Sequence, residues 1–127
     1  MAASSPRCLI VEDQALIGMA LEASLEEAGF TVAGPFSSTV DALAWLTENT
    51  PELALLDVLL KDGPCTRLVR ELRGRGVPFA IYSGLKPPHM PPPELADVPW
   101  LEKPVAREAL VKTLSQMQLR SREAEAR

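Results

Sequence analysis

The sequence predicts an α/β domain built on a five-stranded parallel sheet with helices on both faces. Short apolar runs alternate five times along the 127 residues with segments whose apolar residues recur every three or four positions. Continuous apolar runs are typical of strands that are buried on both faces, and their alternation with amphipathic helices is typical of parallel sheets. Hydrophobic residues make up 46% of the chain, which is enough for a core without disulfides or metals.

The first half of the chain supplies three predicted strands and two predicted helices. The strands are expected at 8–11, 30–33 and 53–56, and the helices at 14–28 and from Ser37-Ser38-Thr39 onward. Gly29 ends the first helix, because glycine readily adopts the backbone conformation that follows a helix end. Gly34-Pro35 is expected to close the second strand, and Pro51 breaks the second helix.

The second half continues this alternation up to a segment that is rich in proline. Asp62-Gly63-Pro64 is interpreted as the start of the third helix, and strands are expected at 77–82 and 98–101. Five prolines fall within 87–93, where the fourth helix would lie. Interior prolines destabilise a helix by about 3 kcal/mol each, so this helix is expected to be short or disrupted. If Pro99 belongs to the last strand, that strand must lie at an edge of the sheet.

The chain is interpreted as one domain over 1–127. Its core is expected at about 7–119, and a final helix follows Lys103-Pro104. The tail at 120–127 is polar and is expected to fray.

Composition excludes several classes of partner and location. The net charge of −4 provides no basic surface for nucleic acid. The sequence shows no apolar stretch that could span a membrane and no signal peptide. Cys8 lies in a predicted strand and Cys65 near a predicted helix start, which indicates reduced thiols and a cytoplasmic location. The single histidine, His89, has no second His or Cys beside it and is expected to be exposed to solvent.

Polar residues capable of chemistry follow four of the predicted strands. Glu12 and Asp13 come after the first strand, and Asp57 comes after the third. Ser83 ends the fourth strand, and Lys103 lies just past the fifth. The carboxyl ends of parallel strands meet at one edge, where ligands bind in such sheets. Each residue alone fits an ordinary strand end, turn or helix cap, but their shared position favours a functional site.

Three carboxylates at one sheet edge predict metal-assisted phosphoryl transfer. Carboxylates this close repel each other, and Mg²⁺ is the hard, oxygen-binding cation that would offset the repulsion. Asp57 would attack a phosphoryl group as an ionised nucleophile and form an aspartyl phosphate. Lys103 and the Ser83 hydroxyl would bind the phosphoryl oxygens.

Four short motifs carry a family resemblance over about 7–119. Together they resemble the signature of response-regulator receiver domains of two-component systems; the motifs are Leu9-Ile10-Val11-Glu12-Asp13, Leu55-Leu56-Asp57-Val58, Tyr82-Ser83-Gly84 and Glu102-Lys103-Pro104. The resemblance implies the flavodoxin-like strand order 2-1-3-4-5 and Mg²⁺ as cofactor. It also implies that a sensor histidine kinase or a histidine phosphotransfer protein donates the phosphoryl group.

The resemblance assigns a role to each matching position of the predicted metal site. Asp57 matches the phosphoacceptor, and Glu12 and Asp13 match the acidic pair. The backbone carbonyl of Leu59 matches the third protein ligand of the metal.

The remaining motif positions match the switch of the family. Ser83 stands where the family has Thr or Ser, and Lys103 matches its lysine. Trp100 occupies the position of the switch aromatic, usually Tyr or Phe, although simple packing on an edge strand is the alternative for this indole. Leu59 and Leu85 each lie two residues after a site residue, and apolar side chains there cannot orient an attacking water. A long-lived phosphoryl group is therefore expected.

The leading hypothesis is a stand-alone binding module controlled by phosphorylation. It would signal through a protein contact at the face made by 87–94, the Trp100 strand and the final helix, or would pass the phosphoryl group on in a phosphorelay. A homodimer through that face is compatible with it. One alternative is a phosphorylation-independent scaffold with a vestigial site. Another is a hydrolase of small phosphate esters, which would normally need a general acid where Leu59 stands.

Overall fold

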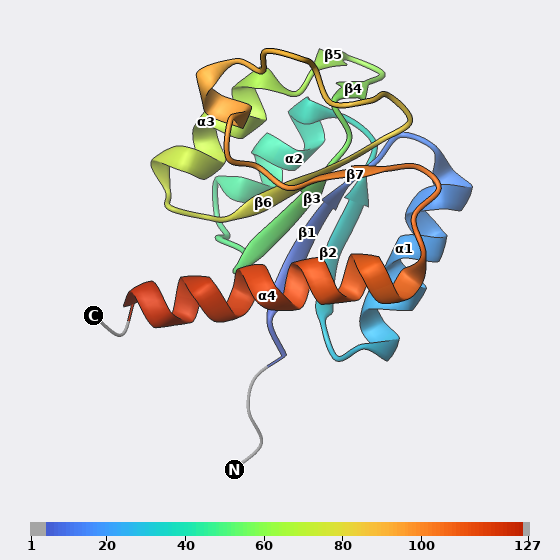
Figure 1. Cartoon of the computed structure of the whole chain (residues 1–127), viewed down its shortest axis with the longest axis vertical. Coiled ribbons are helices and arrows are strands. Elements are labelled where there is room, and N and C mark those ends of the chain that lie inside the picture. Colours follow the sequence, from blue (N-terminus) through green and yellow to red (C-terminus); the bar gives the residue numbers. More distant parts are fainter. Residues whose placement is uncertain (1–4, 126–127) are drawn as a thin grey trace.

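The computed structural model describes residues 5–125, which form a five-stranded parallel sheet with helices on both sides (Figure 1). The strands are β1 (Arg7–Val11), β2 (Thr31–Phe36), β3 (Leu53–Leu56), β6 (Phe79–Ser83) and β7 (Trp100–Glu102). Their order across the sheet is β2-β1-β3-β6-β7. Counted along the chain as five strands, this is the order 2-1-3-4-5, so the predicted fold class and topology are confirmed.

Within residues 5–125, three α-helices and one 3-10 turn lie between the strands, and a fourth α-helix follows the last strand. They are α1 (Ala15–Glu27), α2 (Thr39–Leu46), α3 (Thr66–Gly74), η1 (Pro93–Leu95) and α4 (Arg107–Glu125). In the proline-rich segment the only helical element is η1, three residues long, which confirms the predicted disruption of the fourth helix. Prolines lack the amide hydrogen that an interior helix position must donate.

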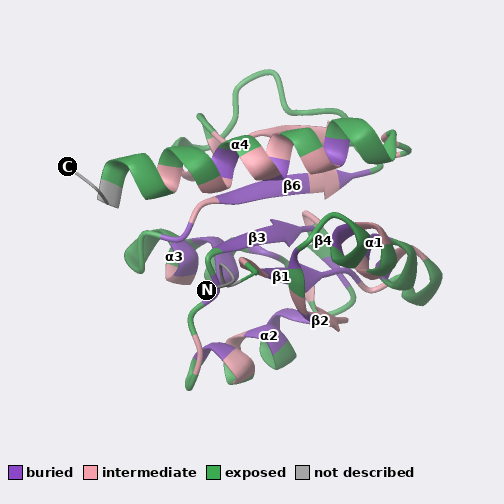
Figure 2. Ribbon diagram, turned by 90° about the horizontal axis from the view of Figure 1, so that it is seen from below, coloured by how far each residue is buried: buried purple, intermediate pink, exposed green. Residues whose placement is uncertain are grey.

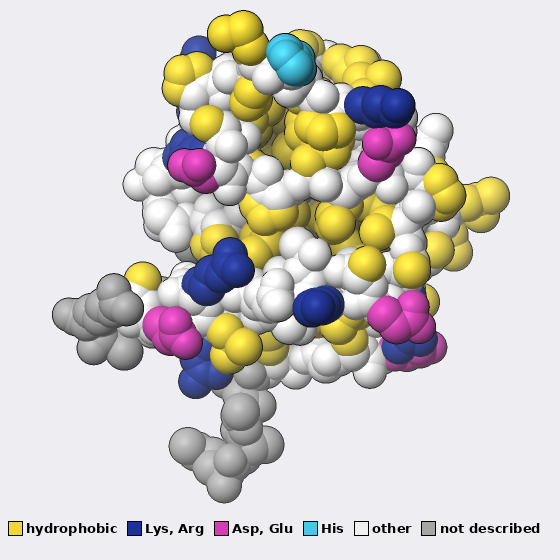
Figure 3. Space-filling view, in the orientation of Figure 1, with side chains coloured by type: hydrophobic (Ala, Val, Ile, Leu, Met, Phe, Trp, Pro, Cys, Tyr) yellow, Lys and Arg dark blue, Asp and Glu magenta, His cyan; other side chains and the backbone are white. Residues whose placement is uncertain are grey.

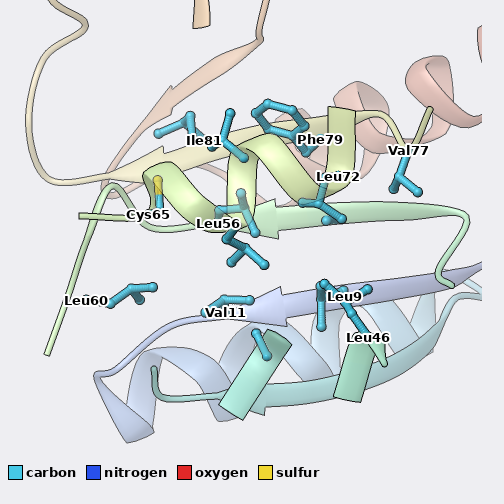
Figure 4. Close-up of a cluster of buried hydrophobic side chains, with 14 of the residues drawn as sticks. Leu9, Val11, Leu46, Leu56, Leu60, Cys65, Leu72, Val77, Phe79 and Ile81 are labelled. Carbon is cyan, nitrogen blue, oxygen red and sulfur yellow. The ribbon is translucent and has the colours of Figure 1, made fainter. Parts of the chain in front are cut away.

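Alternate residues of the strands pack against different pairs of helices. In β1, Leu9 and Val11 pack with α2 and α3, whereas Cys8 and Ile10 pack with α1 and α4. This follows from the strand geometry, in which successive side chains point to opposite faces. Figure 2 shows the result as buried strands between helices that are exposed on their outer sides. Figure 4 shows the first of these two clusters, between the sheet and helices α2 and α3.

The second strand runs further than the sequence predicted. Gly34-Pro35 was expected to close it, but β2 continues to Phe36 through an irregularity opposite Leu9 and Val11 of β1. Gly34 has a φ of +101°, and a Cβ there would lie 2.6 Å from the carbonyl oxygen of Ile10. Glycine therefore lets the two strands approach closely enough for pairing to resume at Phe36.

The segment before the third helix also differs from the prediction. Asp62-Gly63-Pro64 does not begin a helix, because α3 starts only at Thr66. Instead, Leu59–Leu60 (β4) and Gly63–Pro64 (β5) form a short antiparallel pair.

Asp62 caps a different helix from the one expected. Its carboxylate accepts hydrogen bonds from the amides of Thr39 and Val40, each 3.0 Å away, at the first turn of α2. Free amides and the helix dipole favour a negative charge at this end, and these two hydrogen bonds hold the pKa of Asp62 below its ordinary value.

The last two strands are shifted towards their carboxyl ends. β6 begins at Phe79 rather than at residue 77, and β7 begins at Trp100 rather than at residue 98. Pro99 precedes β7, and its carbonyl accepts the amide of Ile81, 2.9 Å away. β7 lies at the edge of the sheet, as expected.

The final helix extends beyond its expected end. α4 continues to Glu125, so most of the tail expected to fray at 120–127 is helical, and residues 126–127 lie outside the described part. Leu110, Leu114 and Met117 anchor the helix against the sheet, and helix hydrogen bonding carries it past that apolar stripe.

Two other expectations concern thiols and membranes. Cys8 and Cys65 are both free and buried, and burial raises the pKa of their thiols to about 12 and about 11. Within residues 5–125, no helix is long and apolar enough to cross a membrane.

The side chain of His89 is exposed to solvent, as predicted.

The Asp62 cap predicts a pH-dependent loss of stability. Because folding lowers the pKa of this carboxyl, its stabilisation is present above the ordinary value of 3.8 and is lost as the pH falls through the folded pKa. Asp62→Ala should therefore lower the melting temperature at pH 7, and the difference should shrink below about pH 4. Asp97→Ala, at another exposed aspartate, is the control. An equal loss in both variants at pH 7 would contradict the cap.

Candidate functional site

The carboxyl edge of the sheet brings together the residues that the motifs singled out. Glu12 follows β1, and its amide donates to the carbonyl of Phe36 at the end of β2, 2.8 Å away. Asp57 follows β3, and its amide donates to the carbonyl of Val11, 3.0 Å away. The amide of Lys103, after β7, donates to the carbonyl of Ser83, 2.8 Å away. These backbone hydrogen bonds continue the ladders past the strand ends and hold the side chains at one edge.

Three carboxylates form an acidic cluster at this edge. Glu12, Asp13 and Asp57 each offer a carboxylate oxygen, and these atoms all lie within 4.8 Å of one another. Glu12 is buried, with 3% of its surface exposed, whereas Asp13 and Asp57 are half-buried. Oε2 of Glu12 accepts a hydrogen bond from the amide of Gln14, 3.0 Å away. The oxygen donor set and its spacing fit a hard divalent cation.

Lys103 supplies the positive charge of the site. Its Nζ lies 2.6 Å from Oε1 of Glu12 and 3.1 Å from Oδ2 of Asp57. Burial alone would lower the pKa of Lys103, but the hydrogen bonds to the two carboxylates and their charges outweigh burial and raise it. The ammonium is therefore protonated at neutral pH and neutralises part of the acidic cluster.

The second oxygen of Asp57 has only a weak contact with the protein. Oδ1 lies 3.4 Å from the amide of Leu59, close to the limit for a hydrogen bond. Because Oδ2 faces Lys103, the two oxygens of this carboxylate have different surroundings. The position of the Leu59 carbonyl as a metal ligand stays a prediction.

Ser83 connects the acidic edge to Trp100 through one backbone segment. The Ser83 Oγ is buried and accepts the amide of Leu85, 3.1 Å away. The carbonyl of the same Leu85 accepts the indole Nε1–H of Trp100, 2.9 Å away. Trp100 is half-buried and packs against the core cluster between the sheet and α3, so it both packs on the edge strand and forms a polar contact.

Leu59 and Leu85 border the site as exposed apolar side chains. Their exposed fractions are 55% and 53%. Neither side chain can orient water by hydrogen bonding.

Some contacts of the site could not be found from the sequence. The backbone groups of Phe36 and Leu85 take part regardless of side-chain identity, so no residue type signals them. The Tyr82 ring centroid lies 5.3 Å from the Lys103 Nζ, a cation–π distance. The only sequence signal for this contact was the position of Tyr82 beside Ser83.

Known structures share this architecture. The receiver domain of PhyR from Erythrobacter litoralis is 27% identical, with a TM-score of 0.78 over 91% of this chain and 92% of that one. SdrG from Sphingomonas melonis is 31% identical, with a TM-score of 0.77 over 91% of this chain and 98% of that one. A receiver domain from Methanospirillum hungatei, at 22% identity and a TM-score of 0.83 over 95% of this chain and 99% of that one, supports the fold alone.

Two sequence comparisons gave different results. A search of curated proteins found no significant match. The family described as the response regulator receiver domain, in contrast, matches residues 8–122, which include every strand-end residue discussed above. Members of this family are signalling domains that generally are not enzymes, typically bind Mg²⁺ at an acidic cluster, and interact with histidine kinases or other signalling partners. The chain belongs to the response regulator receiver domain family.

Proposed function

We propose that this chain accepts a phosphoryl group on Asp57 from a phospho-histidine donor, which is a sensor histidine kinase or a histidine phosphotransfer protein. The observation that carries the proposal is the placement of Lys103, whose ammonium contacts both Glu12 and Asp57 at the sheet edge. An ionised carboxylate held beside a fixed cation needs no general base to act as a nucleophile.

Mg²⁺ would be held by the side chains of Asp13 and Asp57, with Glu12 beside them and the Leu59 carbonyl as a further ligand. Bound Mg²⁺ supplies positive charge that offsets the charge of the phosphoryl oxygens. The carboxylate spacing within 4.8 Å supports this assignment.

The transfer exchanges one bond for another. A carboxylate oxygen of Asp57 forms the new bond to phosphorus as the bond from phosphorus to the histidine nitrogen breaks. Lys103 then binds a phosphoryl oxygen in place of its contact with Asp57. The Ser83 hydroxyl uses an acceptor lone pair for the Leu85 amide, so its hydrogen remains able to donate to a phosphoryl oxygen.

The phosphorylated state would be read by a downstream protein. The surface concerned is made by residues 87–94, β7 and α4, and Trp100 connects it to Ser83 through Leu85. A homodimer through this surface belongs to the same proposal. Two buried thiols without a disulfide support a reducing cytoplasmic location.

Beryllofluoride, a phosphoryl mimic, tests the phosphoacceptor directly. In a Trp45→Phe background, addition of Mg²⁺ and then beryllofluoride should give a saturable change in the fluorescence of Trp100. The change requires Mg²⁺ and should be absent in Asp57→Asn. If fluorescence does not change and intact-mass analysis after incubation with a phosphodonor finds no acyl phosphate, the chain is a phosphorylation-independent scaffold.

Leu59 should prolong the life of the phosphoryl group. An Asn at this position could hydrogen-bond an attacking water, so Leu59→Asn should shorten the half-life of the phosphorylated protein by several-fold. Loss of ³²P label at fixed pH and Mg²⁺ measures it, with Leu59→Met as the apolar control. Equal half-lives for Leu59→Asn and the unmodified chain would refute this role.

Lys103 should contribute to both binding and stability. Lys103→Met should weaken beryllofluoride binding and lower the free energy of unfolding by about 1–3 kcal/mol, because buried Glu12 loses its charged partner. Adding Glu12→Gln should restore part of the stability but not the binding. Urea unfolding at pH 7 measures the change in the free energy of unfolding, and a double variant no more stable than Lys103→Met would argue against the pairing.

A further inference from the structure

An apolar cavity lies beside the site, beneath the segment that replaces the fourth helix. Its volume is about 250 Å³. Val58 lines it from just past β3 and Cys65 from just before α3. Val69 lines it from α3, and Trp100 lines it from β7. The lining is completed by Pro64, Thr66, Pro88, Pro92, Glu94 and Leu95. The proline-rich segment thus contributes Pro88 and Pro92 to this lining.

The lining specifies the chemistry of an occupant. Seven of the ten lining residues are Val, Leu, Trp or Pro, and the only ionisable side chain besides the Cys65 thiol is that of Glu94. An anionic ligand would meet this carboxylate with no cation in the lining to compensate it. An apolar cavity of about 150 Å³ is already large enough to bind benzene. The space beside Trp100 therefore fits one aromatic ring with a short substituent.

The segment over the cavity is attached at its two ends. Leu85 is held by the indole of Trp100, and the Glu94 carbonyl accepts the Nε–H of Arg73 on α3, 2.6 Å away. Five of the residues between these two points are prolines, which have no amide hydrogen to donate. Figure 3 shows hydrophobic side chains gathered on this part of the surface. The arrangement allows a small molecule to reach the cavity without breaking a network of backbone hydrogen bonds.

We propose that this cavity is a binding site for a small, uncharged apolar molecule, about the size of one substituted aromatic ring. The ligand would lie against the indole of Trp100. Because that indole holds Leu85, and Leu85 holds the Ser83 hydroxyl, ligand binding is sensed at the carboxyl edge of the sheet. The proposal goes beyond phosphoryl transfer and does not require it.

Titration with benzyl alcohol, followed by amide and indole NMR resonances in the Trp45→Phe background, tests the proposal. The indole resonance of Trp100 and the amide resonance of Leu85 should shift and saturate. Benzoate, of similar size but anionic, should bind at least about tenfold more weakly, a difference of about 1.4 kcal/mol. Shifts that grow linearly without saturation, or equal affinities for the two probes, would overturn it.

Variants at Cys65 then locate the site. Cys65→Leu should fill the cavity and abolish saturable binding, whereas Cys65→Ala should enlarge the cavity and retain it. If circular dichroism shows that Cys65→Leu does not fold, Thr66→Phe, at an exposed lining residue, takes its place. Saturable binding of unchanged affinity in the folded filling variant places the probe elsewhere and refutes the proposal.

Discussion

The carboxyl edge of the sheet depends on the two ion pairs that the ammonium of Lys103 forms, with Glu12 and with Asp57. A buried glutamate and two half-buried aspartates place carboxylate oxygens within 4.8 Å of one another there. Among the side chains of residues 5–125, this ammonium is the cation that forms ion pairs with two of them. Without it, ionised carboxylates would repel one another in surroundings that screen charge poorly. The same two contacts hold the end of β7 next to the ends of β1 and β3. The ion pairs therefore neutralise charge and also stabilise the positions of these strand ends.

The sheet makes this arrangement possible because the residues within a strand pack in the core, whereas the residues just past its end form the site. Alternate residues of β1 fill the two core layers, and the residues just past the strand end are then free for chemistry. In β6 the buried Ser83 belongs to both, since it ends the strand and lies beside the acidic edge. The fold therefore needs no long loops to assemble the site, because strand register already brings its members together.

Most of the fold and of the acidic cluster could be predicted from the sequence, and the wrong predictions have identifiable physical causes. Apolar runs identified the five strands, and their polar ends identified the acidic cluster, Ser83 and Lys103. The errors arose where backbone geometry or distant contacts decide: a glycine that lets β2 continue, and Asp62, whose partners lie more than 20 residues away in sequence. The Trp100–Leu85 contact was missed as well, because one partner is a carbonyl that every residue possesses.

The two edges of the sheet have a consequence for assembly. β2 and β7 each pair with one neighbour, and edge strands of this kind can recruit strands from other molecules. Here β2 contains Pro35, while β7 is three residues long and lies between Pro99 and Pro104. Proline cannot donate to a new ladder, so both edges resist extension by an added strand. Self-association of this chain would therefore proceed through side-chain contacts rather than through added strands, and the sheet would stay five strands wide.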